Sequence, residues 1–274
     1  MPEVIEIDLE RRFGALRRLH GDAGYARIRA AHVVVVGVGG VGSWAAEALA
    51  RSGVAALTLI DMDQVSESNI NRQVQALGAT VGQSKTQALR ERISDIHPGC
   101  TVHSIEEFVD ETNWPKILMV PVSALIDACD QVRAKAMLAA WAIATDTLLI
   151  SVGAAGGKQV AQAVEVADLA DVTHDPLLAS LRQRLRQHHA AARIGALGVR
   201  CVFSREAVVS GAGESDSTLN CRGYGSSVTV TATFGMVAAG VVLSLLADVC
   251  GNSRRAMPQA QFKGGYTQWL DMGC

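Results

Sequence analysis

Metal-binding and disulfide motifs are missing from this chain of 274 residues. Its six cysteines lie far apart and none forms a C-x-x-C pair, which argues against a zinc ribbon and against a disulfide framework. Scattered free thiols instead suit a reducing cytoplasm. The N-terminal MPEVIEIDLERR is charged and has no apolar signal core, so we expect a cytoplasmic protein.

Charge of either sign is also scarce. Only 19% of the residues are charged and the net formal charge is −2, so no overall basic field attracts nucleic acid, and any such contact must be local. The hydrophobic share of 49% is ample for a large core and excludes intrinsic disorder. The length fits one large domain or two small ones.

No charged residue occurs from Gly223 to Ala247. The stretch is long enough to span a bilayer. Serine and threonine are frequent at its beginning, however, and a strand or loop that runs into a buried helix explains the composition equally well. We expect no stable membrane insertion and keep membrane association through 223–247 as the minor alternative.

Strand-like and helix-like segments alternate along the first half of the chain. HVVVVGVGGVGSWAAEALARSG indicates a strand, a glycine turn and a helix, and the β-branched run 33–36 is typical of a strand buried on both faces. We expect further strands in ALTLID, CTVHSIE, SALIDACD and TLLISVG, with helices over 83–96 and 131–144. This alternation predicts an α/β fold with a Rossmann-like, doubly wound, mainly parallel sheet.

The second half is a less regular extension. We expect a strand or hairpin in KQVAQAVEVADL, an amphipathic helix over 177–189 and a short strand in VRCVFS. Residues 211–227 have the composition of a loop. A final helix should occupy the apolar stretch that follows.

A glycine-rich turn joins the first strand to the first helix of the sheet. Gly37, Gly39 and Gly42 fit G-x-G-x-x-G, and Gly40 lies within the same turn. Such a turn lets the backbone approach a phosphate, and the following helix N-terminus favours negative charge there. The motif alone indicates a mononucleotide or a dinucleotide, and a glycine turn without any ligand remains an alternative.

A crowd of polar side chains follows the second strand. Asp61 ends that strand, where an acid can hold ribose hydroxyls. Arg72 offers a fork suited to phosphate oxygens, and Lys85 begins the next helix. We place Asp130 at the end of the fourth strand, where a carboxylate can hold magnesium. The other candidate nucleotide-binding residues are Asp63, Asn69, Asn71 and Gln73.

Taken together, these groups indicate an enzyme that cleaves a nucleoside triphosphate rather than a protein that only binds a dinucleotide. A nicotinamide dehydrogenase would leave Arg72 and Lys85 unexplained. For single residues a plainer interpretation stays open, because Asp63 and the two asparagines could cap turns and Lys85 could be solvated.

The motifs G-V-G-G-V-G-S, D-M-D-x-V-x-x-S-N-x-N-R-Q and D-A-C-D, with Lys85, resemble the adenylating domain of the ubiquitin-activating superfamily. The resemblance implies an enzyme that uses ATP and magnesium to adenylate a carboxylate. In it Arg72, Lys85 and the asparagine pair line the triphosphate, Asp61 binds the ribose and Asp130 holds the metal. It also implies a homodimer in which an N-terminal arginine reaches the partner's ATP. We assign that role to Arg18, with Arg17 as the alternative.

Segments outside the nucleotide motifs are similar to the tRNA threonylcarbamoyladenosine dehydratase branch of that superfamily. They are R-R-F-G, D-P-L-L-A-S-L-R-x-R-L, C-V-F-S-x-E and V-T-A-T-F-G. This resemblance implies that the threonine carboxylate of threonylcarbamoyladenosine, next to the anticodon of tRNA, is adenylated. Ring closure then expels AMP, so the net change is loss of water.

The resemblance further implies one adenylation domain over 1–274. Within it we distinguish an arm (1–30), a nucleotide-binding half (31–155) and a substrate and dimerisation half (156–274). The alternative function is an adenylyltransferase that activates the C-terminal Gly-Gly of a sulfur-carrier protein. Such activators usually carry two zinc-binding C-x-x-C pairs, and this chain has neither.

Acids are absent between Asp175 and Glu206, where arginines are frequent. Such a window is an electrostatic footprint for a phosphate backbone, with a solvated helix face as the alternative. The candidate RNA-binding residues are Arg182, Arg184, Arg186 and Arg193.

Cys221 is a candidate reactive thiol in the expected loop, although a thiol without a role is the plainer interpretation. A sulfur-relay protein partner is implied only by the family context.

Overall fold

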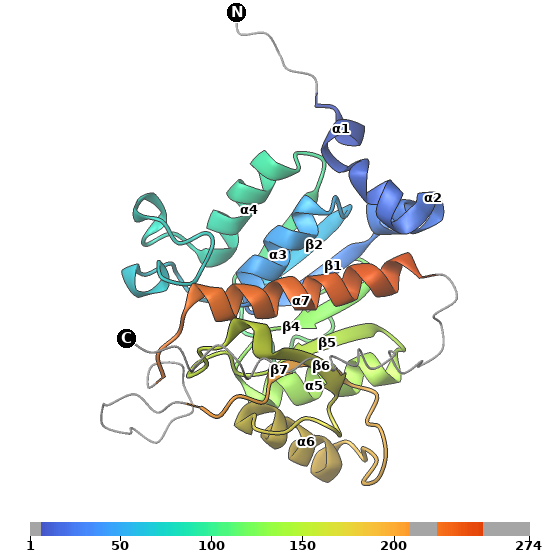
Figure 1. Ribbon diagram of the computed structural model, residues 1–274, viewed down its shortest axis with the longest axis vertical. Coiled ribbons are helices and arrows are strands. Elements are labelled where there is room, and N and C mark those ends of the chain that lie inside the picture. Colours follow the sequence, from blue (N-terminus) through green and yellow to red (C-terminus); the bar gives the residue numbers. More distant parts are fainter. Residues whose placement is uncertain (1–6, 209–223, 249–274) are drawn as a thin grey trace, which may run out of the picture.

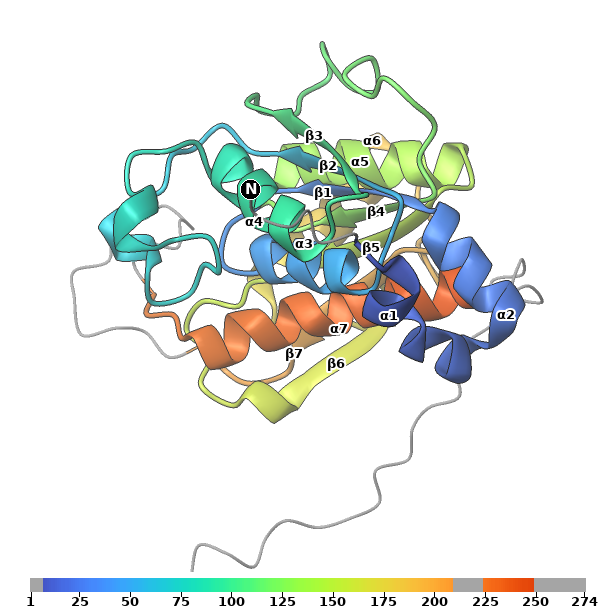
Figure 2. The same ribbon diagram turned by 90° about the horizontal axis from the view of Figure 1, so that it is seen from above.

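The computed structural model describes residues 7–208 and 224–248. In this part of the chain one sheet has the strand order β3-β2-β1-β4-β5-β7-β6, and only β6 runs antiparallel to its neighbour (Figures 1 and 2). The expected α/β, mainly parallel sheet is therefore confirmed. The strands are β1 (His32–Val36), β2 (Ala56–Ile60), β3 (Thr101–Ile105), β4 (Ala124–Asp127), β5 (Leu148–Val152), β6 (Val164–Asp168) and β7 (Arg200–Ser204).

Helices cover both faces of this sheet (Figure 2). Those predicted over 83–96, 131–144 and 177–189 are present, with ends shifted by at most two residues. Short 3-10 turns add η1 (Glu67–Asn69), η2 (Gly78–Thr80) and η3 (Ala161–Ala163). The helices are α1 (Leu9–Phe13), α2 (Ala15–Ala30), α3 (Gly42–Arg51), α4 (Lys85–Ile96), α5 (Val132–Ala144), α6 (Pro176–His188) and α7 (Val228–Ala247).

Strand β1 shows why both faces must be covered. All five of its residues are buried. Val33 and Val35 join a core with α3, α4 and α7, whereas Val34 and Val36 join a second core with α5 and α6. Because successive side chains of a strand point to opposite faces, an unbroken β-branched run needs apolar cover on both sides.

Helix α7 completes the first of these cores. By length and composition it is apolar enough to cross a membrane, yet it packs along α3 and against α2 (Figure 1). Its buried residues include Val230, Phe234 and Val242. The helix begins after Ser227, whose hydroxyl accepts the N–H of Thr229. This packing is that of a core helix, as expected for the apolar stretch.

The N-terminal arm, which contains α1 and α2, packs against the end of α4. The ring of Phe13 lies 4.6 Å from the ring of His97, centroid to centroid. Arg12 Nη1 donates to the carbonyl oxygens of Asp95 and Ile96, at 3.0 and 2.7 Å. These contacts satisfy carbonyls that the last turn of α4 leaves free.

The packing of α7 leads to a first prediction. Phe234→Ala should lower the free energy of unfolding by about 3–5 kcal/mol, because it leaves a cavity in the core. Met236→Ala, two residues further on and 42% exposed, should change it by less than about 0.5 kcal/mol. Urea unfolding in detergent-free buffer measures both. Equal, small effects would show that α7 does not belong to the core in solution.

Candidate functional site

The predicted nucleotide residues gather where neighbouring strands end. The glycine turn follows β1, Asp61 follows β2, and Asp130 follows β4. The strand order reverses between β1 and β4, and ligands of such sheets bind at this crevice. The prediction that Asp130 ends the fourth strand is wrong. The strand ends at Asp127, whose carboxylate is buried in an ion pair, and Asp130 lies exposed before α5.

The turn after β1 requires glycine at two positions. Gly37 has a φ of +82°, and its N–H donates to the carbonyl oxygen of Ile60 at 2.8 Å. A Cβ on Gly42 would lie 1.8 Å from the carbonyl oxygen of Gly37. The N-cap residue of α3, Val41, makes no side-chain capping bond. The N–H of Ser43 already donates to the carbonyl oxygen of Gly39 at 3.1 Å. In the part of the chain that the structure describes, the N–H groups of Gly42 and Trp44 have no such backbone partner, and they could bind an anion such as a phosphate.

Asp61 is fixed against this turn by backbone N–H groups. Its Oδ2 accepts from Val38 N at 2.8 Å and its Oδ1 accepts from Asp63 N at 2.9 Å. Burial raises the pKa of Asp61 above its usual range, while the ammonium of Lys85, 3.9 Å from Oδ1, opposes the rise. The carboxylate thus has a set orientation beside the glycine turn.

Lys85 joins the polar segment after β2 to the start of α4. Its side chain is buried, and Nζ lies 2.6 Å from Asp63 Oδ2. The backbone N–H of Lys85 also donates to the carbonyl oxygen of Asp63, at 3.1 Å. Because Asp63 is exposed, a phosphate could take the place of its carboxylate on Nζ without leaving a buried charge unpaired.

Arg72 and Gln73 lie beside the glycine turn, as the motif predicted. A Cβ on Gly40 would be 3.3 Å from Cγ and Cδ of Arg72, and a Cβ on Gly39 would be 3.9 Å from Gln73 Nε2. Trp44 Nε1 donates to the carbonyl oxygen of Arg72 at 2.9 Å, which ties the segment to α3. The aliphatic part of the Arg72 side chain therefore packs against the glycine turn, while its Nη1 donates to the carbonyl oxygen of Ser68 at 2.6 Å.

The two asparagines of the segment are engaged within the protein. Asn69 Oδ1 accepts from Ser66 N at 3.1 Å, so this side chain caps η1. Asn71 Nδ2 donates to the carbonyl oxygen of Ser226 at 2.9 Å, and its Oδ1 accepts from Arg72 Nη1 at 2.9 Å. The alternative of turn capping thus describes Asn69, whereas Asn71 orients the arginine.

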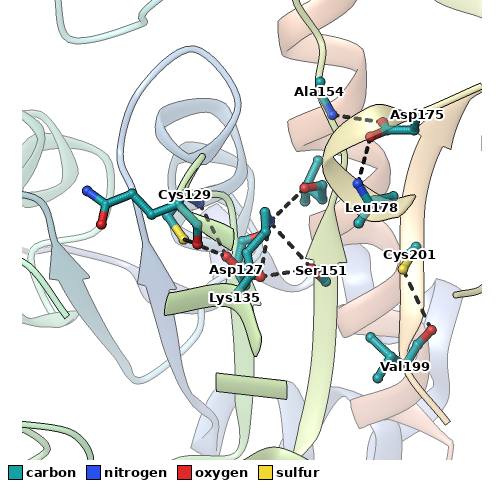
Figure 3. Close-up of polar contacts among 11 residues, drawn as sticks. Asp127, Cys129, Lys135, Ser151, Ala154, Asp175, Leu178, Val199 and Cys201 are labelled. Atoms are coloured by element: carbon teal, nitrogen blue, oxygen red, sulfur yellow. Dashed lines mark hydrogen bonds and ion pairs between the residues drawn. The ribbon is translucent and has the colours of Figure 1, made fainter. Parts of the chain in front are cut away.

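Sequence reasoning missed a buried polar network at the ends of β4 and β5 (Figure 3). Lys135 Nζ donates to Asp127 Oδ2 at 3.0 Å and to the carbonyl oxygen of Val152 at 2.8 Å. Ser151 Oγ donates to the same carboxylate oxygen at 2.8 Å. Burial lowers the pKa of Lys135, but the charge and hydrogen bond of Asp127, together with Cys129 and Cys201, raise it overall. A lysine among the alanines of α5 was the signal available in the sequence.

The arm presents its two candidate arginines differently. Arg17 pairs with Glu10 at 2.9 Å and with Asp22 at 2.8 Å, and its guanidinium lies over the ring of Tyr25. These contacts raise the pKa of Arg17. Arg18 is exposed and pairs with no acid in the part of the chain that the structure describes. Of the two, Arg18 has the side chain free to reach another molecule.

Three of the four candidate RNA-binding arginines share one open groove along α6. Arg182, Arg186 and Arg193 line it, whereas Arg184 does not. Arg182 is also used internally, because its Nη1 donates to the carbonyl oxygens of Leu169 and Val172 at 3.0 and 2.8 Å. Arg186 is used internally as well, because its Nε donates to the carbonyl oxygen of Ala192 at 3.2 Å. Arg193 is the exposed member of the three.

The thiols that the structure describes are poor nucleophiles. Burial raises the pKa of Cys100 to about 11. Burial also raises the pKa of Cys201, and burial together with the charge of Asp127 raises that of Cys129. Cys221 lies outside the described residues.

No group of three or more His, Cys, Asp or Glu side chains could hold a metal ion within residues 7–208 and 224–248. The exposed carboxylate of Asp130 still fits magnesium, which proteins commonly bind through one or two carboxylates plus substrate phosphates and water.

Comparisons with known proteins agree with this geometry. The model of the ThiF family matches residues 11–271. The chain is 42% identical over 252 residues to the tRNA threonylcarbamoyladenosine dehydratase of Escherichia coli, covering 87% of this chain and 94% of the relative. A crystal structure of the E. coli tRNA N6-threonylcarbamoyladenosine dehydratase in complex with ATP matches with a TM-score of 0.80 at 43% identity. That match covers 89% of this chain and 97% of the other.

A relative with the alternative activity is similar over less of its length. The molybdopterin-synthase adenylyltransferase of Salmonella typhimurium is 37% identical over 128 residues, which cover 47% of this chain and 51% of the relative.

The crowded glycine turn leads to a second prediction. Gly42→Ala should lower the melting temperature and abolish nucleotide binding, because the new Cβ would overlap the Gly37 carbonyl. Gly39→Ala meets only an ordinary contact, so it should keep the melting temperature and weaken nucleotide binding alone. Calorimetric titration with ATP, together with thermal unfolding, separates the two effects. Normal ATP affinity in both variants would contradict a phosphate site at this turn.

The raised thiol pKa values give a third prediction. At pH 7.5 the native protein should be alkylated at Cys100 about a hundredfold more slowly than a thiol of ordinary pKa, because less thiolate is present. The rate should rise as the pH approaches 11. Cys129 and Cys201 should react more slowly still. Peptide mass spectrometry after timed iodoacetamide treatment measures each site, with the urea-unfolded protein as reference. Rapid alkylation of native Cys129 would overturn this prediction.

Proposed function

Since this chain belongs to the ThiF family, we propose that it catalyses the ATP-dependent dehydration of threonylcarbamoyladenosine in tRNA, next to the anticodon. The observation that carries the proposal is the similarity to an ATP-bound dehydratase along nearly the whole chain. The site supports it, because the glycine turn, Asp61, Arg72 and Lys85 gather at one crevice of the sheet.

The first step joins the threonine carboxylate to the nucleotide. A carboxylate oxygen attacks the α-phosphorus of ATP, the bond to the β-phosphate oxygen breaks, and an acyl-adenylate and pyrophosphate form. Asp61 would hold the ribose, and the N–H groups of α3 would hold phosphate oxygens. Arg72 and Lys85 would stabilise the negative charge that builds on the leaving pyrophosphate.

The second step closes a ring. A nitrogen of the adjoining carbamoyl group attacks the activated acyl carbon and loses its proton, and AMP leaves with the former carboxylate oxygen. The product is lighter than the substrate by one water. Because attacking and attacked atoms belong to one nucleoside, proximity supplies much of the rate and the enzyme needs no nucleophile of its own. The raised pKa values of Cys100, Cys129 and Cys201 agree with that.

Asp130 would hold magnesium, which supplies charge neutralisation on the phosphates when bound. Arg18 would reach the nucleotide of a second copy, so we propose a homodimer.

We retain the division of one domain into an arm (1–30), a nucleotide half (31–155) and a substrate half (156–274). We propose that the protein acts in the cytoplasm. A sulfur-relay partner stays a hypothesis without support from the described residues.

The alternative is adenylation of a sulfur carrier's C-terminal Gly-Gly. The shared nucleotide site favours neither activity. The lack of C-x-x-C pairs and the short match to the molybdopterin-synthase adenylyltransferase both disfavour the carrier.

The decisive assay gives a fourth prediction. ATP–pyrophosphate exchange, or turnover of ATP, should require tRNA that carries threonylcarbamoyladenosine, and nucleoside mass analysis should find a product lighter by one water. Arg72→Ala should lower kcat by about 10²–10³-fold, the size of effect seen when one preorganised donor is lost. The exposed Arg90→Ala on α4 serves as control and should change little. Adenylation of a carrier's C-terminus without loss of water would replace this function with the alternative.

The groove on α6 gives a fifth prediction. Combined Arg186→Glu and Arg193→Glu substitutions should raise KM for tRNA at least tenfold and flatten its salt dependence, because phosphate contacts are lost. KM for ATP should stay unchanged. Arg90→Glu, on the opposite face of the sheet, makes the same charge change as Arg186→Glu or Arg193→Glu alone and is the matched control for each single variant. If the control raises KM as much as either single variant, the effect is one of net charge and not of this groove.

A further inference from the structure

The groove along α6 is bordered by a second cavity. The basic groove and the second cavity share Ala179 and Arg182 in their linings, so they lie next to each other along α6. At about 1.5 Å per residue, α6 is about 20 Å long. The second cavity has a volume of about 540 Å³, within the range of ligand sites. Its other lining residues are Val172, Thr173, His174, Asp175, Pro176, Ala207 and Val208.

This second cavity lies at the same edge of the sheet as the nucleotide residues. Asp175 Oδ2 accepts from Ala154 N at 2.9 Å, directly after β5, and its Oδ1 accepts from Leu178 N at 2.9 Å (Figure 3). Two further lining residues, Ala207 and Val208, follow β7. The nucleotide residues follow β2, β1 and β4, so the cavity after β5 and β7 lies at the same sheet edge, on the β5 side of them.

His174 stands exposed at this cavity in an unusual conformation. Its φ is +59°, which is uncommon for any residue with a side chain. Its carbonyl oxygen accepts from Lys158 Nζ at 3.3 Å, and its ring Nδ1 is hydrogen-bonded to Thr173 Oγ1 at 3.0 Å.

Lys158 and Thr173, which are hydrogen-bonded to His174, are themselves held in place by other residues. Lys158 is 2% exposed and also donates to the carbonyl oxygen of Ser204 at 3.1 Å. Arg205 Nη1 donates to Thr173 Oγ1 at 2.6 Å, and Arg205 pairs with Glu165 at 3.0 Å. The ring of His174 is therefore exposed at the cavity, while buried and paired side chains fix the backbone around it, as in a preorganised binding site.

We propose that this cavity binds an unpaired base of the tRNA anticodon loop, stacked on the imidazole of His174. The arginines along α6 contact phosphates of the same strand. Single-stranded RNA loops are recognised by bases splayed onto aromatic or imidazole rings beside a basic groove. The apolar side chains of Val172, Pro176 and Ala207 suit the face of a base. The inference rests on the proposed function, because it takes modified tRNA as the substrate.

The test measures binding and turnover separately. Fluorescence anisotropy measures binding of the protein to an anticodon stem-loop that carries threonylcarbamoyladenosine. The same measurement is repeated with a set of stem-loops, each of which has an abasic site at a different nucleotide flanking the modified one. KM for tRNA and for ATP is then measured with intact tRNA. The variants are His174→Ala, His174→Phe and Ala207→Phe, which fills the cavity. His103→Ala, on the edge strand β3, is the control, and melting temperatures report folding.

His174→Ala and Ala207→Phe should weaken RNA binding and raise KM for tRNA roughly tenfold, the loss of one stacked base. KM for ATP should not change, and His174→Phe should restore most of the affinity. On the RNA that is abasic at the contacted nucleotide, His174→Ala should have no further effect.

Unchanged RNA affinity in His174→Ala and Ala207→Phe, with a wild-type enzyme that dehydrates the tRNA, would overturn the base site alone and leave the proposed function standing. An equal loss on every abasic RNA would also overturn it. A wild-type enzyme that neither binds the stem-loop nor dehydrates tRNA would overturn both.

Discussion

One ammonium group, that of Lys135, ties the ends of two central strands together. It donates to the carboxylate of Asp127 at the end of β4 and to the carbonyl oxygen of Val152 at the end of β5. Both charged side chains are fully buried. Loss of either partner would leave an unpaired charge in the interior and lower the free energy of unfolding by about 3–5 kcal/mol. The loop that carries Asp130 begins at one of these ends, so the geometry of the crevice depends on this pair.

The strand order places different groups on the two sides of the Lys135–Asp127 pair. On one side of the pair, β1 and β2 end in the glycine turn and in Asp61, which suit the phosphates and the ribose of a nucleotide. On the other side, β5 and β7 end beside the N-terminus of α6, where the groove starts. The nucleotide residues after β1 and β2 and the depression beside α6 therefore lie at one edge of the sheet.

The fold was predictable because its signals are local. The β-branched run of β1 and the spacing of Gly37 and Gly42 each dictate a backbone path, and the helix ends follow within two residues. The site was predictable only in part. Asp130 was placed on the strand because the motif contains two aspartates, and only the buried partner Lys135 shows which one ends it. Asn69 caps its own turn, a local contact that the alternative of turn capping covered. The fold, in contrast, brings Lys135 to Asp127 and Lys158 to His174, and no local pattern encodes these two contacts.

The position of α7 has a consequence for how the chain folds during synthesis. This helix comes last among the described elements, yet Gly235 lies against the backbone of Val41 and Ala45 at the start of α3, just after the first strand. Contacts that close so long a loop form late. Throughout translation of the intervening segments, the outer face of α3 stays open to solvent. The core that α3 shares with α7 is therefore complete only after α7 has left the ribosome.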